Sequence, residues 1–199
     1  MFITFEGMDG AGKSTQAKLL FNKLRQEGQN TILSREPGGT PLAEKIREII
    51  INDDMDVETQ FFLFNAARRD HVMNKIKPAL INDQIVICDR FFDSTFVYQN
   101  EIGEDLIYMC QHKATDFLYP DITFIIDIPP EIAMKRLEER GNLNSFDKKP
   151  IDYYIKNRDL FYIIAEKHSK RCRFIDGNRN EDFIHEEILK IVEENMIWK

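Results

Sequence analysis

The sequence predicts an α/β fold in which helices cover both faces of a parallel sheet. Short apolar runs rich in β-branched residues alternate along the chain with longer segments of helical spacing, which is the pattern of a doubly wound sheet. The apolar runs are continuous rather than interrupted by polar residues, as expected of parallel strands that are buried on both faces. A glycine-rich turn joins the first run to the first helical segment. We therefore expect three layers, with the sheet in the middle.

Strands are expected at the continuous apolar runs. Four runs are well defined: Phe2–Glu6, Thr31–Ser34, Ile85–Cys88 and Ile122–Asp127. A fifth candidate, Arg173–Asp176, comes directly before Gly177 and Asn178, which form turns readily.

Helices are expected between the strands, where apolar residues recur at helical spacing. The first begins at Lys13 and stops at Gly28, and a later one begins at Pro130, a typical first-turn proline. The complete set is Lys13–Glu27, Pro41–Ile51, Val57–Leu80, Pro130–Gly141, Asp152–Ser169 and Glu181–Trp198.

Length and charge narrow the possible functions. The 199 residues fit a single domain, residues 1–199. The chain starts without a basic leader, and no apolar run approaches the roughly 20 residues that cross a bilayer, so we expect a cytoplasmic protein with no membrane partner. The net charge of −7 argues against nonspecific nucleic-acid binding, which usually needs a basic surface. If this acidic chain binds phosphates, its positive charge must be concentrated in one cleft.

The three cysteines, Cys88, Cys110 and Cys172, show no paired spacing, and reduced thiols are expected. Cys110 and His112 are neighbours, but no second ligand pair follows them, so we do not expect a metal site there.

The polar segment from Gly141 to Pro150 separates two expected helices and has glycine and proline at its ends. We expect an exposed, mobile loop that acts as a short lid. A plain solvated connection would have the same composition, so the sequence leaves both interpretations open.

Residues Gly7–Ser14 match the phosphate-binding pattern G-x-x-x-x-G-K-[ST]. The motif follows an expected strand and opens an expected helix, as its mechanism requires. Its glycines let backbone N–H groups turn toward phosphate oxygens, and the helix N-terminus adds positive potential. Lys13 would reach the β and γ phosphates of a nucleoside triphosphate, and Ser14 would offer its hydroxyl to Mg²⁺. The structural alternative is a glycine-rich turn with an incidental lysine.

Phosphoryl transferases, GTPase switches and ATPase motors all share this loop. A guanine-specific switch needs Asn-Lys-x-Asp, but the Asn-Lys pairs that begin at Asn22 and Asn74 lack the aspartate. A hydrolytic ATPase usually ends a strand with Asp-Glu, whereas the third expected strand here is followed by Asp89 and Arg90. An acid there can hold a Mg²⁺-bound water, and the arginine can bind a second anion. The pair therefore favours transfer between two phosphates.

Four stretches resemble the thymidylate kinase family in order and spacing. They are Phe5–Ser14, Arg35–Thr40, Phe64–Arg68 and Asp89–Gln99. The resemblance runs over nearly the whole chain and implies a P-loop kinase fold with a central five-stranded parallel sheet. It also implies a homodimeric enzyme that transfers the γ-phosphoryl group of ATP to dTMP, giving dTDP and ADP for dTTP synthesis. A different nucleotide or deoxynucleoside acceptor, or a regulator that binds ATP without transfer, remains an alternative.

The chemistry of Phe64 and Arg68 agrees with an aromatic base as ligand. The two residues are four apart on an expected helix and share one face. The ring can stack on a base, while the guanidinium, which has only donors, selects the O4 acceptor of thymine over the amino group of cytosine. The alternative is that Phe64 packs in the core while Arg68 or Arg69 forms a surface ion pair.

The resemblance also implies the other binding residues. Arg90 would clamp the phosphate of dTMP, and Tyr98 would crowd the 2′ position of its sugar. The residues implied for dTMP are Glu36, Arg47, Phe64, Arg68, Arg90, Thr95, Tyr98 and Gln99. Those for ATP are Gly7, Met8, Asp9, Gly10, Ala11, Gly12, Lys13, Ser14, Thr15 and Arg136. Ser14 would hold Mg²⁺ together with Asp9 or Asp89.

One further cation should approach the transferring phosphoryl group. In the family it is an arginine in the phosphate loop or shortly after the opening glycine of the lid, and this chain has neither. The remaining candidates are Arg136, Arg140, Lys148 and Lys149. Because Arg136 is expected beside the adenine, we favour Arg140. The expected catalytic set is Lys13, Arg90, Asp9 and Arg140.

Overall fold

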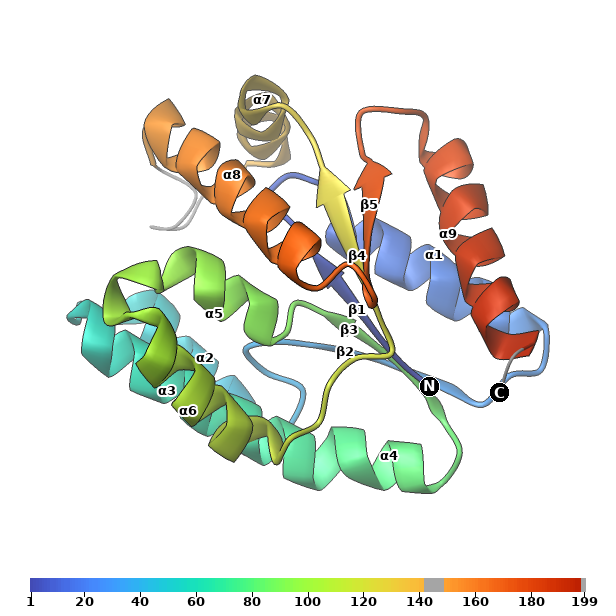
Figure 1. Cartoon of the computed structure of the whole chain (residues 1–199), viewed down its shortest axis with the longest axis horizontal. Helices are drawn as coiled ribbons and strands as arrows, with labels where there is room; N and C mark the ends of the chain where they lie inside the picture. Colours follow the sequence, from blue (N-terminus) through green and yellow to red (C-terminus); the bar gives the residue numbers. More distant parts are fainter. Residues whose placement is uncertain (142–148, 198–199) are drawn as a thin grey trace.

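The computed structural model describes residues 1–141 and 149–197. Its sheet has five parallel strands in the order β2-β3-β1-β4-β5 (Figure 1). The strands are β1 (Phe2–Glu6), β2 (Thr31–Arg35), β3 (Ile85–Asp89), β4 (Ile122–Asp127) and β5 (Cys172–Asp176). All five expected strands are confirmed, and three of them are one residue longer than expected.

The central strand fixes where the loops of the site begin. β1 is buried along its whole length, which explains its continuous apolar character. It pairs with β3 so that Phe5 lies opposite Asp89, and with β4 so that Glu6 lies opposite Ile125. Because parallel strands end at the same edge of a sheet, the segments that follow β1 and β3 start side by side.

Helices form the outer layers. They are α1 (Lys13–Gln26), α2 (Pro41–Asn52), α3 (Val57–His71), α4 (Lys77–Ile81), α5 (Phe92–Tyr98), α6 (Glu104–Thr115), α7 (Pro130–Arg140), α8 (Ile151–Lys167) and α9 (Glu181–Ile197). α1 and α9 pack together over one face of the sheet, and α4, α5 and α8 lie over the other (Figure 1). α2, α3 and α6 pack side by side farther out. No helix in the described parts of the chain is both long and apolar enough to cross a membrane.

The expected helix Val57–Leu80 is not uniform. α3 continues through a π-helical segment, Val72–Ile76, into the short α4. Pro78 explains the change, because a proline lacks the N–H of an α-helical bond and its ring collides with the carbonyl four residues earlier. A wider turn just before the proline relieves that collision.

The sequence analysis missed two helices, α5 and α6. α5 is short and rich in aromatic and β-branched residues, so its sequence does not favour a helix. α6 does carry helix signals that were overlooked. Glu104 and Asp105 lie in its first turn, and Lys113 lies in its last, where each charge interacts favourably with the nearby end of the helix dipole.

A buried ion pair ties α5 to the segment that enters β5. Arg171 donates to both carboxylate oxygens of Asp93, at 2.7 and 2.8 Å, and to the hydroxyl of Thr123 at 2.7 Å. The side chain of Asp93 is only 1% exposed and that of Arg171 is 11% exposed. The carboxylate therefore depends on the guanidinium for its charge balance.

We predict that Arg171→Met lowers the free energy of unfolding by about 3–5 kcal/mol, because it leaves the Asp93 charge buried without its partner. Urea denaturation followed by circular dichroism measures the change. The control is Lys23→Met, which breaks the exposed Lys23–Glu27 pair and should cost less than about 1 kcal/mol. Equal costs for the two variants would contradict this account of Asp93.

Candidate active site

The phosphate-loop motif forms a tight turn between β1 and α1. Gly10 has a φ of 81°, and a Cβ there would lie 2.6 Å from the carbonyl oxygen of Ala133, so this position has no room for a side chain. The loop thus packs directly against the start of α7. Lys13 is the first residue of α1, is 5% exposed, and donates from Nζ to the carbonyl oxygen of Met8 at 2.7 Å. Its ammonium therefore reaches back across the loop.

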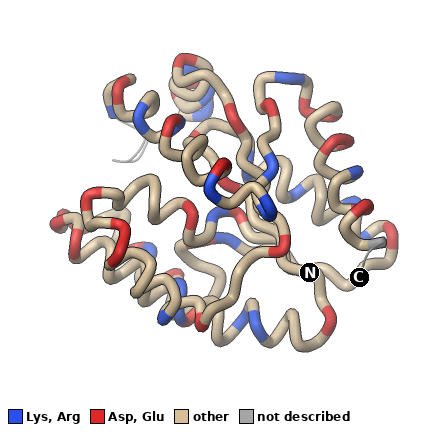
Figure 2. Tube along the Cα trace, viewed as in Figure 1, with Lys and Arg blue, Asp and Glu red and all other residues tan. Residues whose placement is uncertain are grey.

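A cavity of about 680 Å³ opens above this loop. Among the described residues, seven cationic side chains line it: Lys13, Arg35, Arg47, Arg90, Arg136, Arg140 and Arg179. Four acidic side chains of the same described part share the lining: Asp9, Glu36, Asp89 and Glu181. Elsewhere along the chain, basic and acidic residues are mixed (Figure 2). An acidic protein thus carries a cationic cleft at its phosphate loop, as expected.

A second, smaller cavity adjoins the first. Its volume is about 140 Å³, and its lining includes all eight residues that the sequence analysis associated with dTMP. They are Glu36, Arg47, Phe64, Arg68, Arg90, Thr95, Tyr98 and Gln99. Of the residues expected at ATP, the continuous run from Asp9 to Thr15 and Arg136 line the larger cavity, whereas Gly7 and Met8 do not line it.

The two cavities share one wall, formed by Asp9, Glu36, Arg47 and Arg90. Arg90 stands directly after β3 in the left-handed region, with a φ of 68°, which is uncommon for a residue with a side chain. Its guanidinium donates to Asp9 Oδ1 at 2.6 Å, to Ser94 Oγ at 2.9 Å and to the carbonyl oxygen of Gly7 at 3.2 Å. It is therefore held between the phosphate loop and α5, at the boundary of the two spaces.

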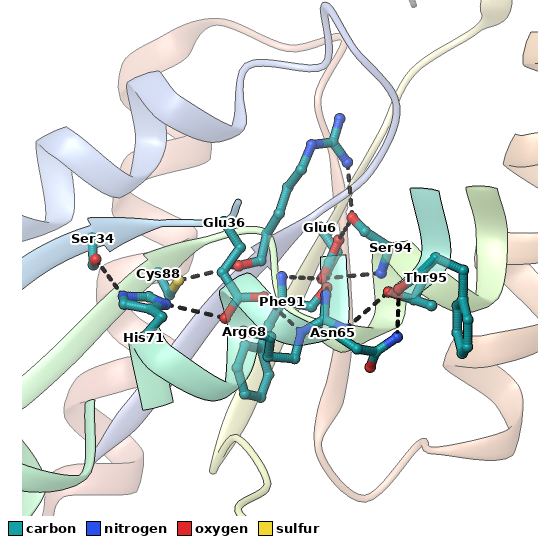
Figure 3. Close-up of polar contacts among 12 residues, drawn as sticks. Glu6, Ser34, Glu36, Asn65, Arg68, His71, Cys88, Phe91, Ser94 and Thr95 are labelled. Carbon is teal, nitrogen blue, oxygen red and sulfur yellow. Dashed lines mark hydrogen bonds and ion pairs between the residues drawn. The ribbon is translucent and has the colours of Figure 1, made fainter. Parts of the chain in front are cut away.

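A buried carboxylate that the sequence analysis missed supports Arg90 from behind. Glu6, at the end of β1, accepts from the backbone N–H of Phe91 at 2.7 Å and from Ser94 Oγ at 2.6 Å (Figure 3). Burial and the nearby charge of Asp93 raise the pKa of Glu6 to about 7. Its contacts fix the turn that carries Arg90. The available signal was a charged residue at the end of a predicted buried strand.

Arg68 is buried in the smaller cavity rather than at the surface. It donates from Nε to Glu36 Oε2 at 2.7 Å and from its terminal nitrogens to Thr95 Oγ1 at 3.0 Å and the carbonyl oxygen of Phe91 at 3.3 Å. Arg69 instead points outward and pairs with the exposed Asp116. The surface-pair alternative therefore describes Arg69 but not Arg68. A guanidinium has more N–H donors than these three contacts use.

The charges around the loop are strongly coupled. Burial raises the pKa of Asp9, but the positive charges of Arg90 and Lys13 outweigh it and bring the value to about 2. Burial and the charge of Arg90 lower the pKa of Lys13 to about 8. Asp9 is therefore ionised at neutral pH. The ammonium of Lys13, in the protein without ligand, loses its proton near pH 8.

The residues expected to hold Mg²⁺ offer a suitable oxygen set. Ser14 Oγ donates to Asp89 Oδ2, while Asp89 Oδ1 is buried and has no hydrogen-bond partner among the described residues. An orphaned carboxylate oxygen beside a hydroxyl fits a hard cation. The oxygen Oδ1 of Asp9 is already paired with Arg90, so Ser14 and Asp89 fit the ion better. Within the described residues no cluster of three or more acidic, histidine or cysteine ligands occurs.

The arginines of α7 lie at the far side of the larger cavity. Arg136 donates to the carbonyl oxygen of Gly177 at 3.1 Å, which joins α7 to the loop after β5. Arg140 lines the same cavity and its charge helps to lower the pKa of Asp9. Most of the expected lid, residues 142–148 with the candidate Lys148, lies outside the described residues. Lys149 lies over the ring of Tyr153, a cavity residue that the sequence analysis missed.

A parallel α/β sheet with a phosphate loop, and an arginine turn at the neighbouring strand end, are features of phosphotransferases of the P-loop kinase class. The family model described as thymidylate kinase matches residues 5–188. The thymidylate kinase of Rickettsia typhi is 44% identical over 193 residues, with 95% of each chain covered. That of Wolbachia pipientis wMel is 43% identical, with 95% of this chain and 98% of the relative covered.

A solved structure agrees with these relatives. The crystal structure of thymidylate kinase from Ehrlichia chaffeensis superposes with a TM-score of 0.79 at 39% identity, covering 96% of this chain and 98% of that one. The chain belongs to the thymidylate kinase family.

We predict that the affinity for ATP falls as the pH rises through about 8, because Lys13 binds phosphate only as the ammonium, which the free protein loses there. Below about pH 8 the group is charged and the affinity should be level. Above it the affinity should fall by up to about tenfold per pH unit. Isothermal titration calorimetry between about pH 7.5 and 9.5 measures this, with Lys13→Met as a weak, pH-independent control. An unchanged wild-type affinity over that range would contradict the prediction.

Proposed function

We propose that this chain transfers the γ-phosphoryl group of ATP to dTMP, giving dTDP and ADP, a step in the supply of dTTP. The observation that carries the proposal is the pair of adjoining cavities with the common wall of Asp9, Glu36, Arg47 and Arg90. One cavity surrounds a phosphate loop, and the other has the aromatic and arginine lining that suits a pyrimidine base. Two phosphate groups that meet at this wall would be in position for direct transfer.

The donor would lie in the larger cavity. Backbone N–H groups of the phosphate loop and the Lys13 ammonium hold its phosphates, and Arg136 lies beside the adenine. Mg²⁺, held by Ser14 and Asp89, would neutralise part of the negative charge on the phosphates. Arg140 would approach the transferring group from α7.

The acceptor would lie in the smaller cavity. Arg90 would bind its phosphate as an ion pair, and Phe64 would stack on the base. The unused donors of Arg68 would reach O4 of thymine, with Thr95 and Gln99 near the same edge of the base. The ring of Tyr98 lies under the Arg90 guanidinium, with 5.1 Å between Arg90 Cζ and the ring centroid. This ring would face the 2′ position of the sugar. A ribose hydroxyl would meet that ring, so deoxyribose is favoured.

We also propose that the protein acts as a homodimer. Large apolar side chains are exposed on the three helices that pack side by side away from the sheet: Leu42 on α2, Phe62 on α3 and Met109 on α6. Exposed apolar residues gathered on adjacent helices are typical of a surface that another protein covers.

The acceptor identity is tested by measuring ADP release with dTMP, dUMP, dCMP, dGMP, UMP and thymidine. We expect dTMP to give the highest kcat/KM.

Lys13→Ala and Arg90→Ala should each abolish transfer, because each removes a cation that neutralises the developing charge. A preference for another acceptor would overturn the choice of dTMP. ATP binding without ADP release on any acceptor would support the regulator alternative.

We predict that Arg68→Ala raises the KM for dTMP by about tenfold or more, since it removes charged hydrogen bonds to the base, while the KM for ATP changes by less than about twofold. Arg69→Ala, at the adjacent exposed position, is the matched control and should leave both values unchanged. An equal loss for the two substrates would move Arg68 out of the base pocket.

A further inference from the structure

A buried chain of polar side chains leads from β2 to Arg68. Figure 3 shows it as a line from Ser34 through His71 to Glu36 and on to Arg68. Ser34 comes from β2, Glu36 from the turn that follows β2, and the other two from α3. His71 lines neither of the two cavities.

The contacts along this chain are short. Ser34 Oγ lies 2.6 Å from His71 Nε2, and His71 Nδ1 lies 3.1 Å from Glu36 Oε1. The other carboxylate oxygen of Glu36 accepts from Arg68 Nε at 2.7 Å. His71 is fully buried, and Ser34, Glu36 and Arg68 are each less than 10% exposed. Little water can therefore replace a lost partner here.

The direction of the hydrogen bonds follows from the chemistry of Glu36. Its carboxylate, paired with Arg68, only accepts, so His71 must carry a proton on Nδ1. In the neutral ring Nε2 is then the acceptor, and the Ser34 hydroxyl donates to it. Both oxygens of Glu36 are consequently engaged, one by His71 and one by Arg68.

A third element holds the histidine ring in place. Gly39, in the turn after β2, packs so closely that a Cβ there would lie 2.5 Å from His71 Nε2 and 2.6 Å from Ser34 Oγ. Its φ of 89° is also one that residues with side chains rarely adopt. The ring is thus fixed from the strand, the turn and its own helix.

We propose that His71 is a specificity-determining positioning residue for the base of the acceptor. By donating to Glu36, it holds the carboxylate against Arg68, so that only the donors of Arg68 face the 4-position of the pyrimidine. Without that contact, a free oxygen of Glu36, which lines the same cavity, could accept from the 4-amino group of cytosine. His71 would thereby discriminate thymine from cytosine without touching either base. This inference rests on the proposed function.

Two amide substitutions separate this role from simple packing. His71→Asn places its amide where Nδ1 stands and can still donate to Glu36, but it loses Ser34. His71→Gln reaches the Nε2 position and can keep Ser34, but it leaves Glu36 without its second donor. The proposal therefore predicts opposite results for the two amides, whereas a packing role predicts that they behave alike or that the larger glutamine does better.

The experiment measures kcat and KM for dTMP, dCMP and ATP in the wild type and both variants, with thermal unfolding of each. We expect His71→Gln to raise the KM for dTMP by about tenfold and to lower the ratio of kcat/KM for dTMP over dCMP by a similar factor. His71→Asn should stay within about threefold of the wild type in both quantities. The KM for ATP should remain within about twofold throughout.

Three results would overturn the inference: a His71→Gln variant that discriminates dTMP from dCMP as well as His71→Asn does, a parallel rise of the KM values for ATP and dTMP, or a His71→Asn variant as impaired as His71→Gln. If His71→Gln does not fold, Glu36→Gln, which removes the carboxylate, must lower the same ratio; an unaltered ratio would also refute the inference. A wild type inactive on dTMP would instead refute the proposed function.

Discussion

The parallel pairing of β1 with β3 is the constraint from which the site follows. It sets the ends of the two strands next to each other, so the phosphate loop and the turn at Arg90 begin side by side. Arg90 then donates hydrogen bonds to Asp9 and Gly7 on the phosphate loop and to Ser94 on α5. One guanidinium thereby becomes the boundary between two cavities. The chemistry of the family needs such a boundary, because donor and acceptor must meet there while water is excluded.

Buried charges give this boundary its rigidity. Glu6 holds the turn that carries Arg90, Glu36 holds Arg68, and Asp93 ties α5 to the entry of β5 through Arg171. A buried charge is costly unless it is paired, so each of these carboxylates restricts its partner to one geometry. The protein places its cationic groups by anchoring them to buried anions. The net negative charge of the chain and the cationic cleft are therefore compatible.

Much of the fold could be predicted from the sequence, because the continuous apolar strands and the glycine-rich loop are strong local signals. The five strands appear where expected, and every residue implied for dTMP lines one cavity. The helix α5 could not be predicted in the same way, since its aromatic and β-branched residues form a helix only through tertiary packing. The π-helical segment before Pro78 was likewise hidden within a longer helical pattern.

The supporting residues of the site were harder to find than the residues that face the cavities. Glu6 and His71 make their contacts across large separations in sequence, so no local spacing marks them. Burial is what makes them important, and burial of a single polar residue is not visible in a pattern of apolar positions. The residues expected to touch a ligand belong to recognisable sequence motifs. The residues that orient them come together only in the folded structure.

The arrangement of the site implies that the two cavities hold two nucleotides at once, with their phosphates meeting at Arg90. The test is calorimetric titration of dTMP into the protein saturated with Mg²⁺ and a non-hydrolysable ATP analogue. We expect one dTMP to bind per chain, with an affinity no weaker than in the absence of the analogue. Displacement of one nucleotide by the other would show that they compete for a single space and would refute simultaneous binding.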